Sequence, residues 1–163
     1  MDSVSVNDTQ VTDSKLVELA GFHAYRDYPD GFEFSVNHVK YEVVDTKYLH
    51  PTGLDALTVL NLSTKELTVV YVGTNTEQIE DIVTDVQLLT DLSLPQITAA
   101  KQYYEDMNKK YASAGGVSSV TGNSLGGALA NAVGVNHPEV KTVTLNPALL
   151  PKGEMERLLH YSP

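Results

Sequence analysis

The spacing of apolar side chains changes about half-way along the chain. Over residues 39–43 apolar and charged side chains alternate, which predicts a half-buried strand. Two apolar, β-rich runs follow at 57–62 and 67–72, and a short polar segment, 63–66, separates them. This arrangement is typical of an antiparallel hairpin. The first half therefore predicts strands, and the residues Tyr28–Gly31, which include Pro29, predict a turn before them.

Helical spacing marks one segment near the N-terminus and most of the second half. A first helix is expected to begin at Asp13 or Ser14, because either side chain can cap a helix. Its apolar positions are Leu16, Val17, Leu19 and Ala20. The apolar positions of a second helix are Ile79, Ile82, Val83, Val86 and Leu89. Pro95 is expected to open a third helix, since proline suits the first turn. Its apolar face holds Ile97, Ala100, Tyr104, Met107 and Tyr111.

The last third of the chain alternates between strand and helix. A strand is predicted over Val117–Val120, a helix from Leu125 and a further strand over Thr142–Leu145. Early hairpin strands followed by β-α-β units predict an α/β fold, with a mixed sheet and helices on both of its faces. We expect one domain over residues 1–163, with a loose polar segment at 1–13.

Composition narrows the classes of partner. The 163 residues carry a formal net charge of −10, so nucleic acid and anionic membranes are poor partners, whereas a neutral ester or lipid is compatible. The chain has no cysteine, which excludes disulfides and thiolate metal sites. Its first residues lack the basic start and apolar core of a signal peptide, so we expect a cytoplasmic protein or export by a leaderless route.

The segment Gly122–Gly126 carries the clearest chemical signal. It reads Gly-x-Ser-x-Gly and stands between the predicted strand and helix, which is the context of a nucleophile elbow. Gly122 and Gly126 would let the backbone turn tightly, and Gly127 would keep the first helical turn thin. Ser124 would lie at the helix N-terminus, where the Leu125 N–H can donate to an oxyanion. The alternative is a chance match, because small residues are common at such turns.

A second oxyanion donor is expected from the loop after an earlier strand. The run that ends at Val72 leads into Gly73 and Thr74, and Thr74 could supply its backbone N–H and its hydroxyl. Thr74 and Glu77 also fit a capping box, so the simpler role of this threonine is to start the next helix.

Together these residues resemble the lipase class 3 family of α/β-hydrolases. The elbow of that family usually reads Gly-His-Ser-Leu-Gly-Gly-Ala-Leu-Ala, and residues 122–130 depart from it only at Asn123. The family's oxyanion strand usually ends in Arg-Gly-Thr or Arg-Gly-Ser, whereas here Val72 replaces the arginine. The resemblance covers about residues 57–150, including the segment Thr144–Ala148 after the elbow helix.

The resemblance implies an α/β-hydrolase-like three-layer sandwich with a mixed, mostly parallel sheet. It implies a serine carboxylester hydrolase of lipase or esterase type, with Ser124 as nucleophile and with Thr74 and Leu125 as oxyanion donors. The substrate would be a carboxylic ester such as an acylglycerol or phospholipid, and neither a metal nor an organic cofactor is implied.

The acid and base of a catalytic triad do not follow the serine convincingly. In this fold the order is Ser, then Asp or Glu, then His. The histidines after Ser124 are His137, which we expect at the surface, and His160, close to the end of the sequence. The earlier histidines, His23, His38 and His50, do not match the family's base. We therefore expect Asp and His from polypeptide beyond Pro163.

The predicted sheet would also end at an open edge. A sheet that stops at Thr142–Leu145 leaves unpaired backbone groups, so we expect further chain, a partner chain or a second copy to cover it. Two other functions remain open. One is a catalytically inactive binding or interaction module that keeps the elbow as architecture. The other is acyl transfer or thioester cleavage on the same scaffold.

Overall fold

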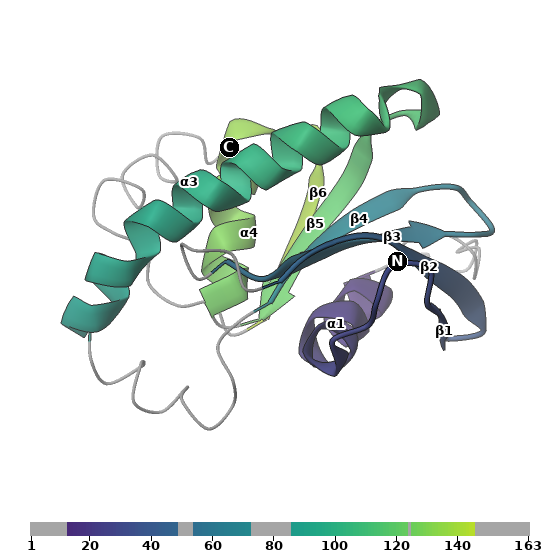
Figure 1. The fold of residues 1–163 in the computed structure, drawn as a ribbon, viewed down its shortest axis with the longest axis horizontal. Coiled ribbons are helices and arrows are strands. Elements are labelled where there is room, and N and C mark those ends of the chain that lie inside the picture. Colours follow the sequence, from purple (N-terminus) through teal and green to yellow (C-terminus); the bar gives the residue numbers. More distant parts are fainter. Residues whose placement is uncertain (1–12, 49–53, 73–85, 124, 146–163) are drawn as a thin grey trace, which may run out of the picture.

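One mixed sheet organises the described part of the chain. The computed structural model describes residues 13–48, 54–72, 86–123 and 125–145. Within these ranges six strands lie side by side in the order of the sequence (Figure 1). They are β1 (Glu33–Val36), β2 (Val39–Lys47), β3 (Ala56–Asn61), β4 (Leu67–Tyr71), β5 (Val117–Asn123) and β6 (Lys141–Leu145).

Antiparallel pairing dominates the sheet, so the prediction of a mostly parallel sheet is wrong. The strands β1 to β4 form an antiparallel meander, and only β4–β5 and β5–β6 pair in parallel. The cause is the length of the connections, because the short links between the first four strands cannot carry a crossover. The predicted mixed sheet and the hairpin formed by β3 and β4 are confirmed.

Helices cover both faces of the sheet and make three layers, as predicted (Figure 1). One face carries α1 (Asp13–Gly21) and the short 3₁₀ helix η2 (His23–Arg26). The other carries α3 (Val86–Lys110) and α4 (Leu125–Asn136), and a second 3₁₀ turn, η3 (Ala112–Ala114), follows α3. The chain is thus an α/β fold. No helix in the described ranges is long and apolar enough to cross a membrane.

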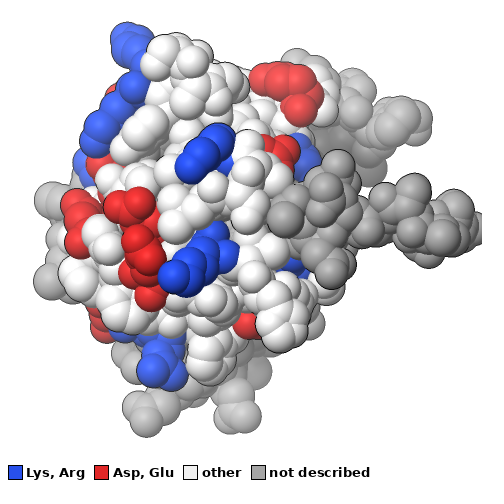
Figure 2. All heavy atoms as spheres, turned by 90° about the vertical axis from the view of Figure 1, so that its right-hand side faces the viewer, with Lys and Arg blue, Asp and Glu red and all other residues white. Residues whose placement is uncertain are grey.

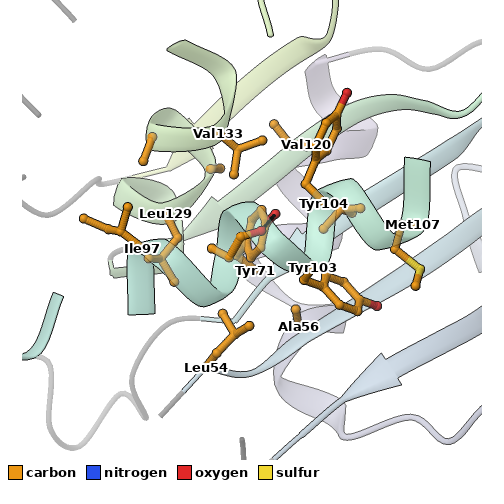
Figure 3. Packing of buried hydrophobic residues seen from close by; sticks show 14 of the residues in the cluster. Leu54, Ala56, Tyr71, Ile97, Tyr103, Tyr104, Met107, Val120, Leu129 and Val133 are labelled. Carbon is orange, nitrogen blue, oxygen red and sulfur yellow. Dashed lines mark hydrogen bonds between the residues drawn. The ribbon is translucent and has the colours of Figure 1, made fainter. Parts of the chain in front are cut away.

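The core under α3 and α4 is built around tyrosines from the helix and the sheet (Figure 3). The predicted apolar face of α3 is confirmed, since four of its five residues are buried and Tyr111 packs against them. Pro95, however, lies inside α3 and does not open a helix. Proline removes one intrahelical hydrogen bond, and we attribute the continuity of α3 to the buried face that follows Pro95. The expected helix positions 79–83 lie outside the described residues.

The core on the other face lies between α1 and the meander. Leu16, Leu19 and Ala20 are buried as predicted, but Val17 is 37% exposed, because the buried stripe of α1 does not include it. The strand β1 was not predicted from the sequence. Its four residues are too few to give a periodic signal, and its position is fixed by pairing with β2.

Among the polar contacts between α3 and the sheet are those of two buried tyrosine hydroxyls. Near the carboxyl end of β4, the Tyr71 hydroxyl donates to the carbonyl of Ala100 over 2.8 Å. Over β2 and β3, the Tyr103 hydroxyl donates to Asp45 over 3.2 Å and lies 2.8 Å from the Thr58 hydroxyl. Burial raises the pKa of both tyrosines, which keeps both hydroxyls protonated.

Both edges of the sheet lie in the described part, where β1 pairs only with β2 and β6 only with β5. Residues 146–163 lie outside the described ranges, so the expected cover for the edge of β6 stays a prediction. Residues 1–12, which make up nearly all of the expected loose segment, also lie outside them.

Adjacent residues of α1 provide a direct test of its buried stripe. Leu16 is 0% exposed, and we expect Leu16→Ala to lower the free energy of unfolding by about 2–5 kcal/mol through loss of buried surface and a cavity. Val17→Ala should cost less than about 1 kcal/mol. Urea unfolding followed by circular dichroism measures both values. Equal losses in the two variants would contradict the orientation of α1.

Candidate functional site

A strand-to-helix corner stands where the sequence predicts the elbow. The strand β5 ends at Asn123, three residues beyond the predicted end, and α4 begins at Leu125. Ser124 is the one position between them and lies outside the described residues. Strand before and helix after are therefore confirmed, while the position of the serine side chain stays a prediction.

Backbone packing at the corner explains the first glycine of the motif. A Cβ atom placed on Gly122 would overlap the carbonyl group of Gly126 and would come within 2.8 Å of the Gly127 nitrogen. Real Cβ atoms essentially never approach other atoms this closely. The end of β5 and the first turn of α4 therefore pack backbone against backbone. Gly126 and Gly127 are buried there.

The first turn of α4 supplies hydrogen-bond donors at this corner. In any α-helix the first four N–H groups lack an acceptor within the helix, and the helix dipole makes this end positive. Leu125 is the first residue of α4, so its N–H is one of these four. The corner can thus stabilise a negative oxygen. That the Leu125 N–H serves an oxyanion is untested by the structure.

The carboxyl ends of three strands meet at this edge of the sheet. β4 and β6 run parallel to β5, and Gly122 pairs with Tyr71 on one side and with Thr144 on the other. After β4, the Val72 N–H donates to the Asp55 carbonyl over 2.8 Å. Thr74 itself lies outside the described residues. The structure therefore places the strand that leads to Thr74 beside the strand that leads to Ser124. The role of Thr74 as an oxyanion donor stays a prediction.

His137 lies at the far end of α4. The helix has 12 residues, so its two ends are roughly 18 Å apart. The His137 ring contacts Tyr104, with centroids 4.3 Å apart, and its Nε2 lies 3.3 Å from a Glu105 carboxylate oxygen. Its Nδ1 lies 3.6 Å from Glu139. His137 is thus half-buried in a contact between α3 and α4 and not fully at the surface, and it is remote from the corner, as expected.

His23 is a buried residue whose two ring nitrogens both have partners. It lies in η2, on the face of the sheet that carries α1. Its Nδ1 lies 2.8 Å from the Tyr28 hydroxyl, and its Nε2 lies 3.2 Å from the Glu18 carboxylate. Its ring packs against Phe34 with centroids 4.5 Å apart. Burial lowers the pKa of His23, although Glu18 opposes this shift. We assign His23 a packing role.

No histidine in the described ranges lies at the corner. His38 stands in the turn between β1 and β2 with a φ of 69°, at the opposite edge of the sheet. His50 and His160 lie outside the described residues. A group of three or more His, Cys, Asp or Glu side chains that could hold a metal was not found in the described ranges.

Tyr71 is a residue at this edge that the sequence analysis did not single out. It ends β4, is fully buried and pairs with Gly122. The apolar, β-rich run at 67–72 indicated a strand, but nothing in the sequence indicated that this side chain reaches a helix beside the corner.

No family model matches the chain, and no curated protein matches it. A solved structure of a triacylglycerol lipase from Penicillium expansum is similar to it, with a TM-score of 0.44 and 18% sequence identity. The similarity covers 81% of this chain and 56% of that one, so the chain spans little more than half the length of that lipase.

The corner gives a prediction about the strand glycine. We expect Gly122→Ala to destabilise the protein by more than about 3 kcal/mol or to prevent folding, because the added methyl group collides with backbone that cannot move aside. Gly115→Ala is the matched control, since its Cβ meets nothing within 4 Å, although its φ of 97° strains any side chain. It should cost about 1 kcal/mol. Thermal unfolding that ranks Gly115→Ala as the more damaging change would contradict the packed corner.

Buried His23 gives a prediction about acid. The pKa of His23 in the folded protein lies below its ordinary value of 6.5, so the unfolded chain binds more protons in the window between the two values. The stability from neutral His23 is thus complete above pH 6.5 and is lost as the pH falls through the lowered pKa. His23→Phe has no titratable group at this position and so lacks this pH-dependent contribution to stability. We expect the difference in unfolding free energy between wild type and His23→Phe to shift against the wild type on acidification. A difference that is constant with pH would refute it.

Proposed function

We propose that this protein is a serine carboxylester hydrolase of lipase or esterase type that acts through an acyl-enzyme on Ser124. The observation that carries the proposal is the contact between Gly122 and the first turn of α4. Such a corner lifts the intervening residue out of the sheet and aims it away from the strand, beside free N–H groups. A serine in that place is suited to attack a carbonyl carbon.

The proposed reaction has two half-reactions. The Ser124 oxygen adds to the ester carbonyl as a base takes its proton, and the oxyanion of the tetrahedral intermediate accepts hydrogen bonds from the N–H groups of Leu125 and Thr74. The intermediate collapses, the C–O bond to the alcohol breaks, and the same base returns the proton to that alcohol. Water then attacks the acyl-enzyme by the same route and releases the carboxylic acid.

A base is essential, because a serine hydroxyl is a weak nucleophile at neutral pH. The histidines that the structure describes lie away from the corner. We therefore propose that an Asp and a His from polypeptide beyond Pro163, in the same chain or a partner, complete the site.

Charge favours a neutral substrate. The net charge of −10 would repel strongly anionic surfaces. On the face in Figure 2, basic side chains are scattered among acidic ones and do not gather into a continuous basic surface. A neutral ester or lipid is therefore the proposed substrate class, and nucleic acid is not.

Labelling of the complete protein with a fluorophosphonate tests this proposal. We expect one adduct at Ser124, located by mass spectrometry, and none in Ser124→Ala. Ser118→Ala, which changes a serine in the same strand, should label like the wild type. Without the nucleophile, turnover of a short-chain aryl ester should fall by at least about 10³-fold.

The binding-module alternative predicts the opposite result. In that case Ser124 stays unlabelled in the complete protein, and wild type and Ser124→Ala show equal residual rates. That outcome would overturn the hydrolase proposal.

A further inference from the structure

Tyr71 lies between two small residues near the carboxyl end of β4. On the face that carries α3 and α4, its row of paired residues runs through Lys47, Ala56, Tyr71, Gly122 and Thr144. Its direct neighbours in this row are Ala56, whose side chain is a methyl group, and Gly122, which has no side chain. Figure 3 shows its ring standing between the sheet and the helices, with Leu129 of α4 close by.

The Tyr71 hydroxyl crosses from the sheet to α3. It donates to the carbonyl of Ala100 over 2.8 Å, and both residues are buried. Burial, together with the nearby Tyr103 and Tyr104, raises the pKa of Tyr71, so the hydroxyl keeps its proton and stays a donor. A buried donor of this kind is costly to leave without a partner, so the contact favours one position of α3.

The position of α3 reaches the corner through α4. Ile97, Ala100 and Tyr104 of α3 lie in the same core cluster as Leu129 and Val133 of α4, and the two helices pack along each other. At its start, α4 is in backbone contact with Gly122, which is the sheet neighbour of Tyr71. Tyr71 therefore pairs with the strand residue at the corner and also bonds to α3, the helix that packs on α4.

We propose that Tyr71 is a positioning residue for the proposed ester hydrolysis: its hydroxyl sets α3 on the sheet and thereby aligns the first turn of α4 at the corner. This inference rests on the proposed function. Small misplacements of reacting groups cost far more in rate than in stability, so loss of the hydroxyl should appear mainly as slower acylation.

Tyr103 offers a matched control on the same helix. It too is buried and sends its hydroxyl to the sheet, where it meets Thr58 of β3 and Asp45 of β2. Those strands lie two and three places from β5 in the sheet, whereas β4 is its direct neighbour. Tyr71→Phe and Tyr103→Phe thus each remove one buried hydroxyl between α3 and the sheet, but only the first does so beside the corner.

The experiment compares wild type, Tyr71→Phe and Tyr103→Phe in the complete protein. The readouts are the rate constant for fluorophosphonate labelling of Ser124, kcat and KM on a short-chain aryl ester, and the midpoint of thermal unfolding. We expect Tyr71→Phe to lower the labelling rate and kcat on the order of tenfold with KM within about twofold, and Tyr103→Phe to change each by less than about twofold. Both should lower the unfolding midpoint similarly.

A variant with 4-aminophenylalanine at position 71 gives a second measurement, because its N–H groups can donate to Ala100. It should restore most of the labelling rate, whereas its failure to do so would overturn the proposal. Equal rate losses in Tyr71→Phe and Tyr103→Phe, or no loss in either, would also overturn it while the hydrolase proposal stands. A wild type that does not label at Ser124 overturns the proposed function and this inference with it.

Discussion

The contact between the end of β5 and the first turn of α4 sets the constraint on which the rest of the site depends. Strand and helix approach until the backbone of Gly122 meets the backbone of Gly126, which leaves no room for a Cβ atom. The strand β5 ends at Asn123 and α4 begins at Leu125, so one position separates strand from helix. The close packing at the corner thus depends on the absence of a Cβ atom at Gly122.

The strand that carries the corner is held from both faces of the sheet. On one face α4 lies against Gly122, and Gly134 lets the same helix approach Thr142 of β6. On the other face the Thr121 hydroxyl lies 2.7 Å from the Val143 carbonyl and 3.3 Å from that of Leu16 in α1. Two neighbouring residues of β5 therefore contact the helices on opposite faces, Thr121 contacting α1 and Gly122 contacting α4. These contacts limit how far the corner can move. Such rigidity is what an oxyanion site requires, because preorganised donors need no rearrangement during the reaction.

Sequence patterns predicted the parts of the fold in which the preference of a short segment for strand, helix or turn is the same as the structure it has in the folded protein. Alternation over 39–43 and the apolar runs around residues 63–66 became β2, β3 and β4, and the glycine motif became the corner. The failures have specific causes. Pro95 signals a helix start locally, yet the apolar face that follows it is buried along one continuous helix. The strand β1 has four residues, too few for apolar and polar side chains to alternate recognisably. The number of antiparallel pairs depends on the lengths of the connections between strands, which the spacing of apolar residues does not reveal.

The site was predictable only where the motif itself encodes the geometry. Gly122 and Leu125 could be placed because glycine spacing and helix onset are local properties. Tyr71 could not, since its contact with Ala100 joins residues 29 positions apart and depends on how α3 lies on the sheet. A bond of this kind has no signature in a single sequence.

The most direct test of the central claim is a crystal structure of the complete protein after reaction with a phosphonate ester. The decisive quantity is the distance between the phosphonyl oxygen of the adduct and the backbone nitrogen of Leu125. We expect about 2.7–3.1 Å, the separation of a hydrogen bond to an oxyanion. An adduct whose oxygen points away from α4, or a side chain at position 124 turned into the sheet, would contradict the account.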